Sequence, residues 1–272
     1  MQTNSTLRKR SFHLYWKNRE VLWPAFLLFA LTSVVWFVIQ TYLIQGNLLK
    51  DTLNFVYQLA LTPITLGLYH MLLHLVRGGE ISLPMLFTFV RRPQRLRKLC
   101  AACLFIQLPV LIISLLTLSL DIVDREIIQT DQATALSGGI VAAGLVITWL
   151  SLRLFLFPYL FLSDPKETII TLVKSSFQTM KGRVRRLIWF GITVYWWSIL
   201  LLAAFMALSS ALFSPMNLLK AENAATPERL LYQLGLSLVM ALLNPYLYLA
   251  LAGFANEQMK SAQSLKKQSE KA

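Results

Sequence analysis

Six apolar stretches alternate with polar segments along the chain. A helix needs about 20 mainly apolar residues to cross the hydrocarbon of a bilayer, and each stretch reaches that length without an Asp or Glu residue. The stretches span residues 21–44, 53–76, 99–120, 135–162, 187–213 and 230–254. The pattern predicts an all-α, polytopic integral membrane protein with six transmembrane helices.

The apolar residues surround every face of these stretches. Residues 110–116 and 199–206 together contain one serine and otherwise only apolar side chains. A helix of a soluble protein would instead show a polar face at a period of 3.6 residues. Hydrophobic residues make up 56% of the chain, which is above the usual share of a soluble domain. A large soluble helical protein is therefore excluded.

Lys and Arg residues indicate the orientation, because they resist transfer across the membrane. Of the 26, 21 lie in the polar segments 1–20, 77–98, 163–186 and 255–272, which must share one side if all six stretches span. The opposite side holds four. We therefore expect a basic cytoplasmic segment at 1–20, a membrane domain at 21–254 and a polar cytoplasmic tail at 255–272.

The net charge of +13 suits an anionic inner leaflet, which attracts each nearby basic residue by about 1 kcal/mol. Anionic membrane lipids are the expected partners, and a membrane-protein partner stays open. The chain has no groove-reading motif and no basic stretch interleaved with aromatic residues, so nucleic acid is not an expected partner.

The polar segments before the odd-numbered stretches are typical of amphipathic surface helices. The clearest predicts a helix that starts at Asp164 as N-cap, with Pro165 at the first position and Glu167 returning the cap. A second is expected from Ser82 onward, with an apolar face of Leu83, Leu86, Phe87 and Val90. The segment 1–20 is a weaker third.

Each even-numbered stretch contains a proline: Pro63, Pro158 and Pro245. Combined with the basic segments, this spacing suggests a three-fold repeat. Each repeat unit would contain one surface helix followed by a hairpin of two spans.

Arg153 is the one charged residue within a stretch. An intramembrane charge is a functional candidate by default, and a polar cavity or lipid contact could form from Arg153, His70, Asn244 and Gln107. Arg153 also lies near the cytoplasmic end, where its guanidinium can reach the headgroups or bond to a backbone carbonyl. Both interpretations stay open.

Two further motifs could indicate a metal site or a redox site, but each lacks part of the pattern that such a site needs. His70 and His74 lie one helical turn apart, but the glutamate of a zinc hydrolase motif is missing. Cys100 and Cys103 form a CxxC motif without the soluble βαβ context of a redox protein. We expect no metal and no cofactor. Paired acids or an activated nucleophile are also missing, so the chain is not expected to be an enzyme.

Several short motifs share their order and spacing with one bacterial family. They are Pro63 with Gly67; Arg77, Gly78, Gly79 and Glu80 followed by Leu86, Phe87 and Phe89; Asp164, Pro165, Ser175 or Ser176, Met180, Lys181 and Gly182; and Pro245, Tyr246, Phe254 and Glu257. The chain resembles the polytopic membrane proteins of domain of unknown function 975. The family usually has one glycine where this chain has Gly78 and Gly79. The resemblance implies a multi-span protein of the bacterial plasma membrane with no assigned reaction.

Two functions therefore compete. The first is a non-enzymatic envelope or accessory scaffold that contacts anionic lipid. The second is a transporter or lipid-handling permease with a polar cavity near Arg153.

Overall fold

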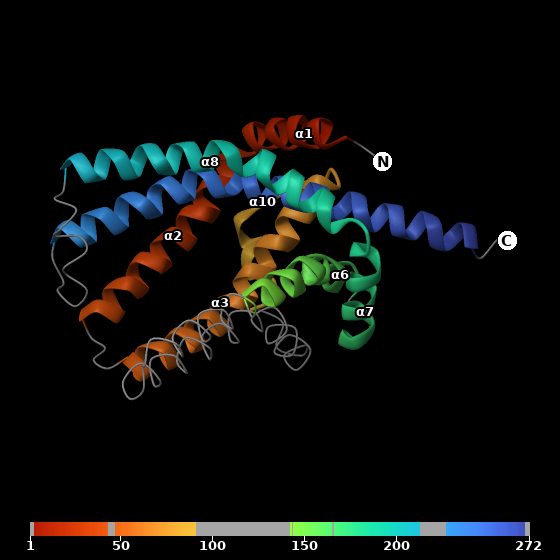
Figure 1. Cartoon of the computed structure of the whole chain (residues 1–272), viewed down its shortest axis with the longest axis horizontal. Coiled ribbons are helices and arrows are strands. Elements are labelled where there is room, and N and C mark those ends of the chain that lie inside the picture. Colours follow the sequence, from red (N-terminus) through yellow and green to blue (C-terminus); the bar gives the residue numbers. More distant parts are fainter. Residues whose placement is uncertain are drawn as a thin grey trace. The chain divides into compact units, whose positions relative to one another are not determined.

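The computed structural model describes residues 3–42, 47–90, 142, 144–164, 166–212 and 227–269, and the regular structure within them is helical (Figure 1). The chain divides into two compact units. Unit 1 comprises Met1–Gln45, Leu68–Leu86 and Arg186–Ala272, and unit 2 comprises Gly46–Gly67 and Phe87–Arg185. The all-α class is confirmed for the described part of the chain.

The apolar stretches form long helices. Four described helices are long and apolar enough to cross a bilayer: Arg19–Thr41, Thr52–Val76, Gly144–Ser163 and Leu231–Ser264. A bent pair, Val184–Trp196 and Ser198–Leu208, adds a fifth candidate with an angle of 42° at its break. The predicted stretch at 99–120 lies outside the described residues. The described residues thus contain four helices, or five with the bent pair, that could span a membrane.

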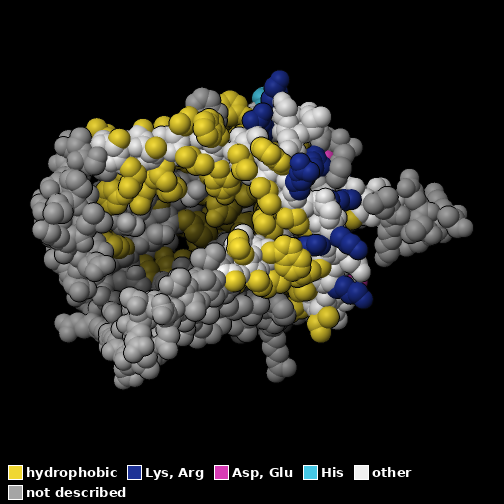
Figure 2. Space-filling model, viewed as in Figure 1, with side chains coloured by type: hydrophobic (Ala, Val, Ile, Leu, Met, Phe, Trp, Pro, Cys, Tyr) yellow, Lys and Arg dark blue, Asp and Glu magenta, His cyan; other side chains and the backbone are white. Residues whose placement is uncertain are grey.

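The helices α2 (Arg19–Tyr42) and α8 (Val184–Leu212) leave much of their apolar surface uncovered by protein. Only 17% of the most apolar window of α2 is buried, and Val35 of α2 and Leu201 of α8 are about half exposed. Exposed apolar surface costs roughly 25 cal/mol per Å² in water. Hydrophobic side chains also follow α8 in Figure 2. These faces therefore suit acyl chains as their solvent.

The last helix, α10 (Pro227–Ser269), runs antiparallel to α8. The rings of Phe190 and Phe254 stack with centroids 5.3 Å apart, and those of Phe205 and Tyr232 lie 5.7 Å apart. Early residues of α8 thus meet late residues of α10. Consequently the basic start of α8 and the polar end of α10 lie at the same end of unit 1.

The helix α10 is longer than the predicted span, because it continues to Ser269 where the sequence suggested a change to a tail at residue 255. The helix α1 (Asn4–Lys17) packs on α10 along the end of the predicted span and the start of this continuation. The rings of Phe12 and Tyr15 contact Tyr246 at 6.0 and 6.4 Å. The buried residues of α1 recur every fourth position: Leu7, Ser11 and Tyr15. Segment 1–20 therefore contains a helix with one protein-facing side.

The end of α3 (Asn47–Val76) explains the unusual pair of glycines. Gly78 has a φ of +93°, and the amides of Gly78 and Gly79 donate to the carbonyls of Leu75 and His74 at 3.0 Å each. This is a Schellman ending, which needs a left-handed residue. A Cβ on Gly79 would overlap the ring of His74. Gly78 is therefore suited to its position by its positive φ, and Gly79 by the lack of a side chain that would overlap His74.

The prediction of an amphipathic surface helix from Ser82 onward is wrong, because the helix that forms there is short. The segment forms a short 3₁₀ helix, Leu83–Phe87, in which the amide of Met85 donates to the carbonyl of Ser82 at 3.1 Å. Leu86 is fully buried, whereas Val90 is 54% exposed. A 3₁₀ helix has three residues per turn, whereas the predicted apolar face assumed the 3.6 residues of an α-helix. Leu83, Leu86, Phe87 and Val90 therefore do not align on one face.

The N-cap expected at Asp164 is also wrong. The amide of Asp164 donates to the carbonyl of Leu160 at 2.9 Å and ends α6 (Phe157–Ser163). The helix α7 (Ile169–Met180) instead begins after Thr168, whose hydroxyl accepts from the amide of Thr171 at 3.3 Å. Thr168 has the extended backbone of an N-cap. Glu167 therefore precedes the helix, and Pro165 lies outside the described residues.

Candidate functional site

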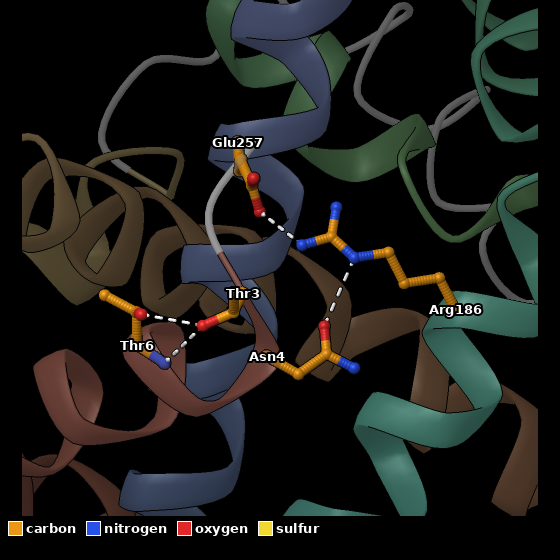
Figure 3. A network of polar contacts seen from close by, with 5 residues as sticks. All are labelled: Thr3, Asn4, Thr6, Arg186 and Glu257. Atoms are coloured by element: carbon orange, nitrogen blue, oxygen red, sulfur yellow. Dashed lines mark hydrogen bonds and ion pairs between the residues drawn. The ribbon is translucent and has the colours of Figure 1, made fainter.

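A polar cluster joins three helices at the basic end of unit 1. Nη2 of Arg186, from the start of α8, donates to Oε2 of Glu257 on α10 at 3.1 Å. Nε of the same guanidinium donates to Oδ1 of Asn4 on α1 at 3.2 Å. Figure 3 shows both contacts beside the N-cap of α1, where the hydroxyl of Thr3 accepts from the amide of Thr6. We call Asn4, Arg186 and Glu257 the polar cluster.

The polar cluster is partly withdrawn from solvent. The side chains of Arg186 and Glu257 are 23% and 12% exposed. The guanidinium also lies 5.5 Å from the ring centroid of Phe254, which adds a cation–π contact. In such surroundings a charge pair is screened less than at an open surface. The cluster therefore fixes α1, α8 and α10 relative to one another within unit 1.

A cavity of about 420 Å³ lies beside the polar cluster, between α1 and α10. Its volume falls in the usual range of small-molecule sites. Its lining combines charged, hydroxyl, amide and apolar residues: Leu7, Arg10, Ser11, Leu14, Val76, Gly253, Asn256, Glu257, Lys260, Ser261 and Ser264. We call this space the α1–α10 cavity.

Two contacts define the walls of the α1–α10 cavity. Nη2 of Arg10 donates to the carbonyl of Val76 at 3.0 Å, which satisfies a carbonyl at the end of α3. On the other side a Cβ on Gly253 would meet Oγ of Ser11 at 3.4 Å, so the two helices approach closely there. The guanidinium of Arg10 is thus held at the cavity wall.

Arg77 reaches the same layer from the loop after α3. Its Nε donates to Oδ1 of Asn256, a buried amide of α10, at 3.4 Å. Partial burial lowers the pKa of the Arg77 guanidinium below its ordinary value. The group stays charged, since that ordinary value is far above neutral pH. Arg77, a residue of the motif that resembles the bacterial family, thus bonds to Asn256, which lines the α1–α10 cavity.

Arg153 lies in unit 2, where it is bonded to α7. Its Nη1 donates to the carbonyl of Phe177 at 3.2 Å, and Oγ of Ser176 donates to the carbonyl of Arg153 at 2.8 Å. The guanidinium lies 5.0 Å from the ring centroid of Trp149. These contacts favour the interpretation of Arg153 as a structural residue bonded to a backbone carbonyl.

The predicted cavity residues in unit 1 are His70 and Asn244. Neither of them lines the α1–α10 cavity. The rings of His70 and His74 stack at 6.4 Å, and no group of three or more His, Cys, Asp or Glu residues suited to a metal occurs in the described ranges. Gln107 lies outside those ranges.

The remaining motif residues lie in a turn, within α10 or at exposed positions. Gly182 has a φ of +75° in the turn that links α7 to α8, and Lys181 beside it is exposed. Pro245 is buried inside α10, and Tyr246 next to it packs on α1. Glu80 is exposed.

The polar cluster and the α1–α10 cavity are the features that the sequence did not predict. Glu257 entered only as a motif residue and Arg186 only as one basic residue among many. One signal was present in the sequence: Asn256, Glu257 and Gln258 are three successive polar residues directly after an apolar stretch. Asn256 and Gln258 are buried, which is unusual for a solvated tail.

Four long apolar helices, or five with the bent pair, and their exposed apolar faces are typical of a helical multi-pass membrane protein. No family model matches the chain, and neither a curated protein nor a solved structure matches it.

Proposed function

We propose that this chain is a non-enzymatic protein of the bacterial plasma membrane that binds anionic inner-leaflet lipid at its basic end. Its role would be an envelope scaffold or an accessory subunit for another membrane protein. The observation that carries the proposal is the antiparallel pairing of α8 and α10, which gathers basic residues at one end of apolar helices. Figure 2 colours the described Lys and Arg side chains dark blue and the hydrophobic side chains yellow.

The proposal includes the finer topology that the sequence predicts. The chain would cross the membrane six times, in three repeated units, with both termini in the cytoplasm. The family resemblance to domain of unknown function 975 supports such a multi-span protein. Each basic residue near an anionic leaflet contributes about 1 kcal/mol, so the gathered cations favour this orientation and this lipid class. Nucleic acid is not a proposed partner.

Transport through a cavity near Arg153 is the competing function. A transporter needs polar groups that converge on an accessible site near the bilayer midplane. The bonds from Arg153 to α7 occupy part of its guanidinium, and His70 and Asn244 do not join the α1–α10 cavity. The scaffold function is therefore the one we favour.

The lipid preference can be tested by extracting the full chain in mild detergent and measuring its co-purified lipids and proteins by mass spectrometry. We expect anionic phospholipid to be enriched over the bulk membrane. The triple variant Lys181→Gln, Arg183→Gln, Arg185→Gln should lose this enrichment. A matched triple variant of Lys50, Lys220 and Arg229, all on the predicted opposite side, should keep it. Equal lipid composition in protein and bulk membrane would contradict the proposal.

A further inference from the structure

The α1–α10 cavity has cations on a polar side and aliphatic groups on another. Arg10 and Lys260 supply the cations, whereas Leu7, Leu14 and Val76 supply the apolar lining. We propose that this cavity binds one phosphate group, carried by a phospholipid headgroup or by a free small phosphate. The inference deepens the proposed function and rests on it, since it names one discrete site within the anion-attracting end.

The charge balance of the lining favours an anion. Glu257 is its one carboxylate, and that charge is offset by Arg186 at 3.1 Å. The charges of Arg10 and Lys260 therefore dominate the cavity. Charge-assisted hydrogen bonds to phosphate are about twice as strong as neutral ones, so two cations in one lining give phosphate an advantage over a neutral polar ligand.

The hydrogen-bonding capacity of Arg10 also fits a phosphate. A guanidinium has five N–H donors, and the bond to the carbonyl of Val76 uses one of them. That bond positions the side chain before a ligand arrives, which lowers the entropy cost of binding. Lys260 is exposed and its ammonium has three donors. One cation is thus positioned by the fold, and the other can adjust to the ligand.

The position of the cavity along α10 favours the phospholipid as the source. Its α10 lining begins at Gly253 and ends at Ser264, around and beyond the predicted end of the apolar stretch. Headgroups occupy this level of a bilayer. The aliphatic side chains would then contact the glycerol backbone and the first methylenes of a lipid, groups that a free phosphate lacks.

Native mass spectrometry of the full, delipidated chain tests the proposal by titration with phosphatidylglycerol in one arm and inorganic phosphate in the other. We expect one saturable adduct per chain. Ser261→Trp, which fills the cavity, should abolish it, and Lys260→Gln should weaken it about tenfold, the effect of one charge-assisted hydrogen bond. The control Gln263→Trp changes an exposed residue of α10 outside the lining, and its binding should stay within about twofold of wild type.

The outcomes separate the site from the general lipid preference. A saturable adduct with phosphatidylglycerol identifies a lipid site, and one with inorganic phosphate alone identifies a small-phosphate site. Binding that never saturates at one, or that is unchanged in both Ser261→Trp and Lys260→Gln, overturns the inference. In that case the enrichment of anionic lipid would persist if the proposed function holds and vanish if it does not. Elution volume and thermal unfolding of each variant verify that it is folded.

Discussion

Removing one partner of the ion pair in the polar cluster should destabilise the protein more than replacing both partners. Glu257→Gln leaves the guanidinium of Arg186, which is 23% exposed, without its carboxylate. Breaking a fully buried pair costs about 3–5 kcal/mol, whereas an exposed pair is worth about 1 kcal/mol or less. The partial burial of this pair places Glu257→Gln between these limits, at about 2 kcal/mol of unfolding free energy.

The double variant Arg186→Met, Glu257→Leu removes both charges and fills the space with apolar groups. Such replacements are often neutral because the cost of desolvating the two charges disappears with them. We expect the double variant to lie within about 1 kcal/mol of wild type, although it also loses the bond to Asn4. The double-mutant cycle is closed by the single variants Arg186→Met and Glu257→Leu, each of which leaves one unpaired charge and should cost about 2 kcal/mol, so the coupling energy should be about 1.5 kcal/mol or more.

Reversible unfolding in mixed micelles, followed by far-UV circular dichroism, measures these free energies. Glu80→Gln provides a matched control, since Glu80 is exposed, and its effect should stay within about 0.5 kcal/mol. Additive single effects, with a coupling energy under about 0.5 kcal/mol, would refute the reasoning. In that case the cluster would be a surface pair and would not fix α1, α8 and α10.

Three further predictions concern other parts of the chain. Gly79→Ala should destabilise by up to about 1 kcal/mol, because the exposed ring of His74 must turn away from the added methyl group, and adding His74→Ala should recover most of the loss in a thermal-unfolding assay. Arg153→Met should lower the unfolding free energy by about 1 kcal/mol through loss of its bond to the carbonyl of Phe177, and it should leave anionic-lipid enrichment unchanged. In a background without native cysteines, a cysteine at position 181 should react with an impermeant maleimide only after permeabilisation of the cells; labelling in intact cells would contradict the proposed orientation.

The apolar helices were predictable because the bilayer imposes the same demand on every span. Backbone N–H and C=O groups have no water to bond in hydrocarbon, so a long apolar stretch must be helical. The stretch predicted at 21–44 is observed as Arg19–Tyr42, and that at 53–76 ends at Val76 as expected. The length and hydrophobicity of a stretch are therefore enough to predict such a helix.

The boundaries of the short polar segments were not predictable on the same basis. Asp164 and Thr168 are both good N-cap residues, and only four positions separate them. The choice depends on which residue the preceding helix leaves extended, and α6 uses the amide of Asp164 for its own last turn. Local sequence therefore offered two capping solutions of similar energy, and the preceding helix selected between them.

The polar cluster shows a second limit, because its partners lie far apart in the sequence. Arg186 and Glu257 are separated by 71 positions, and Asn4 and Arg186 by 182. No helical period links such residues; they meet because α8 and α10 run antiparallel and α1 packs on the end of α10. A run of buried polar residues directly after an apolar stretch, as at Asn256 and Gln258, is therefore a sign that the helix continues and stays packed against protein. In this chain that part of α10 contributes Glu257 to the ion pair and several lining residues to the α1–α10 cavity.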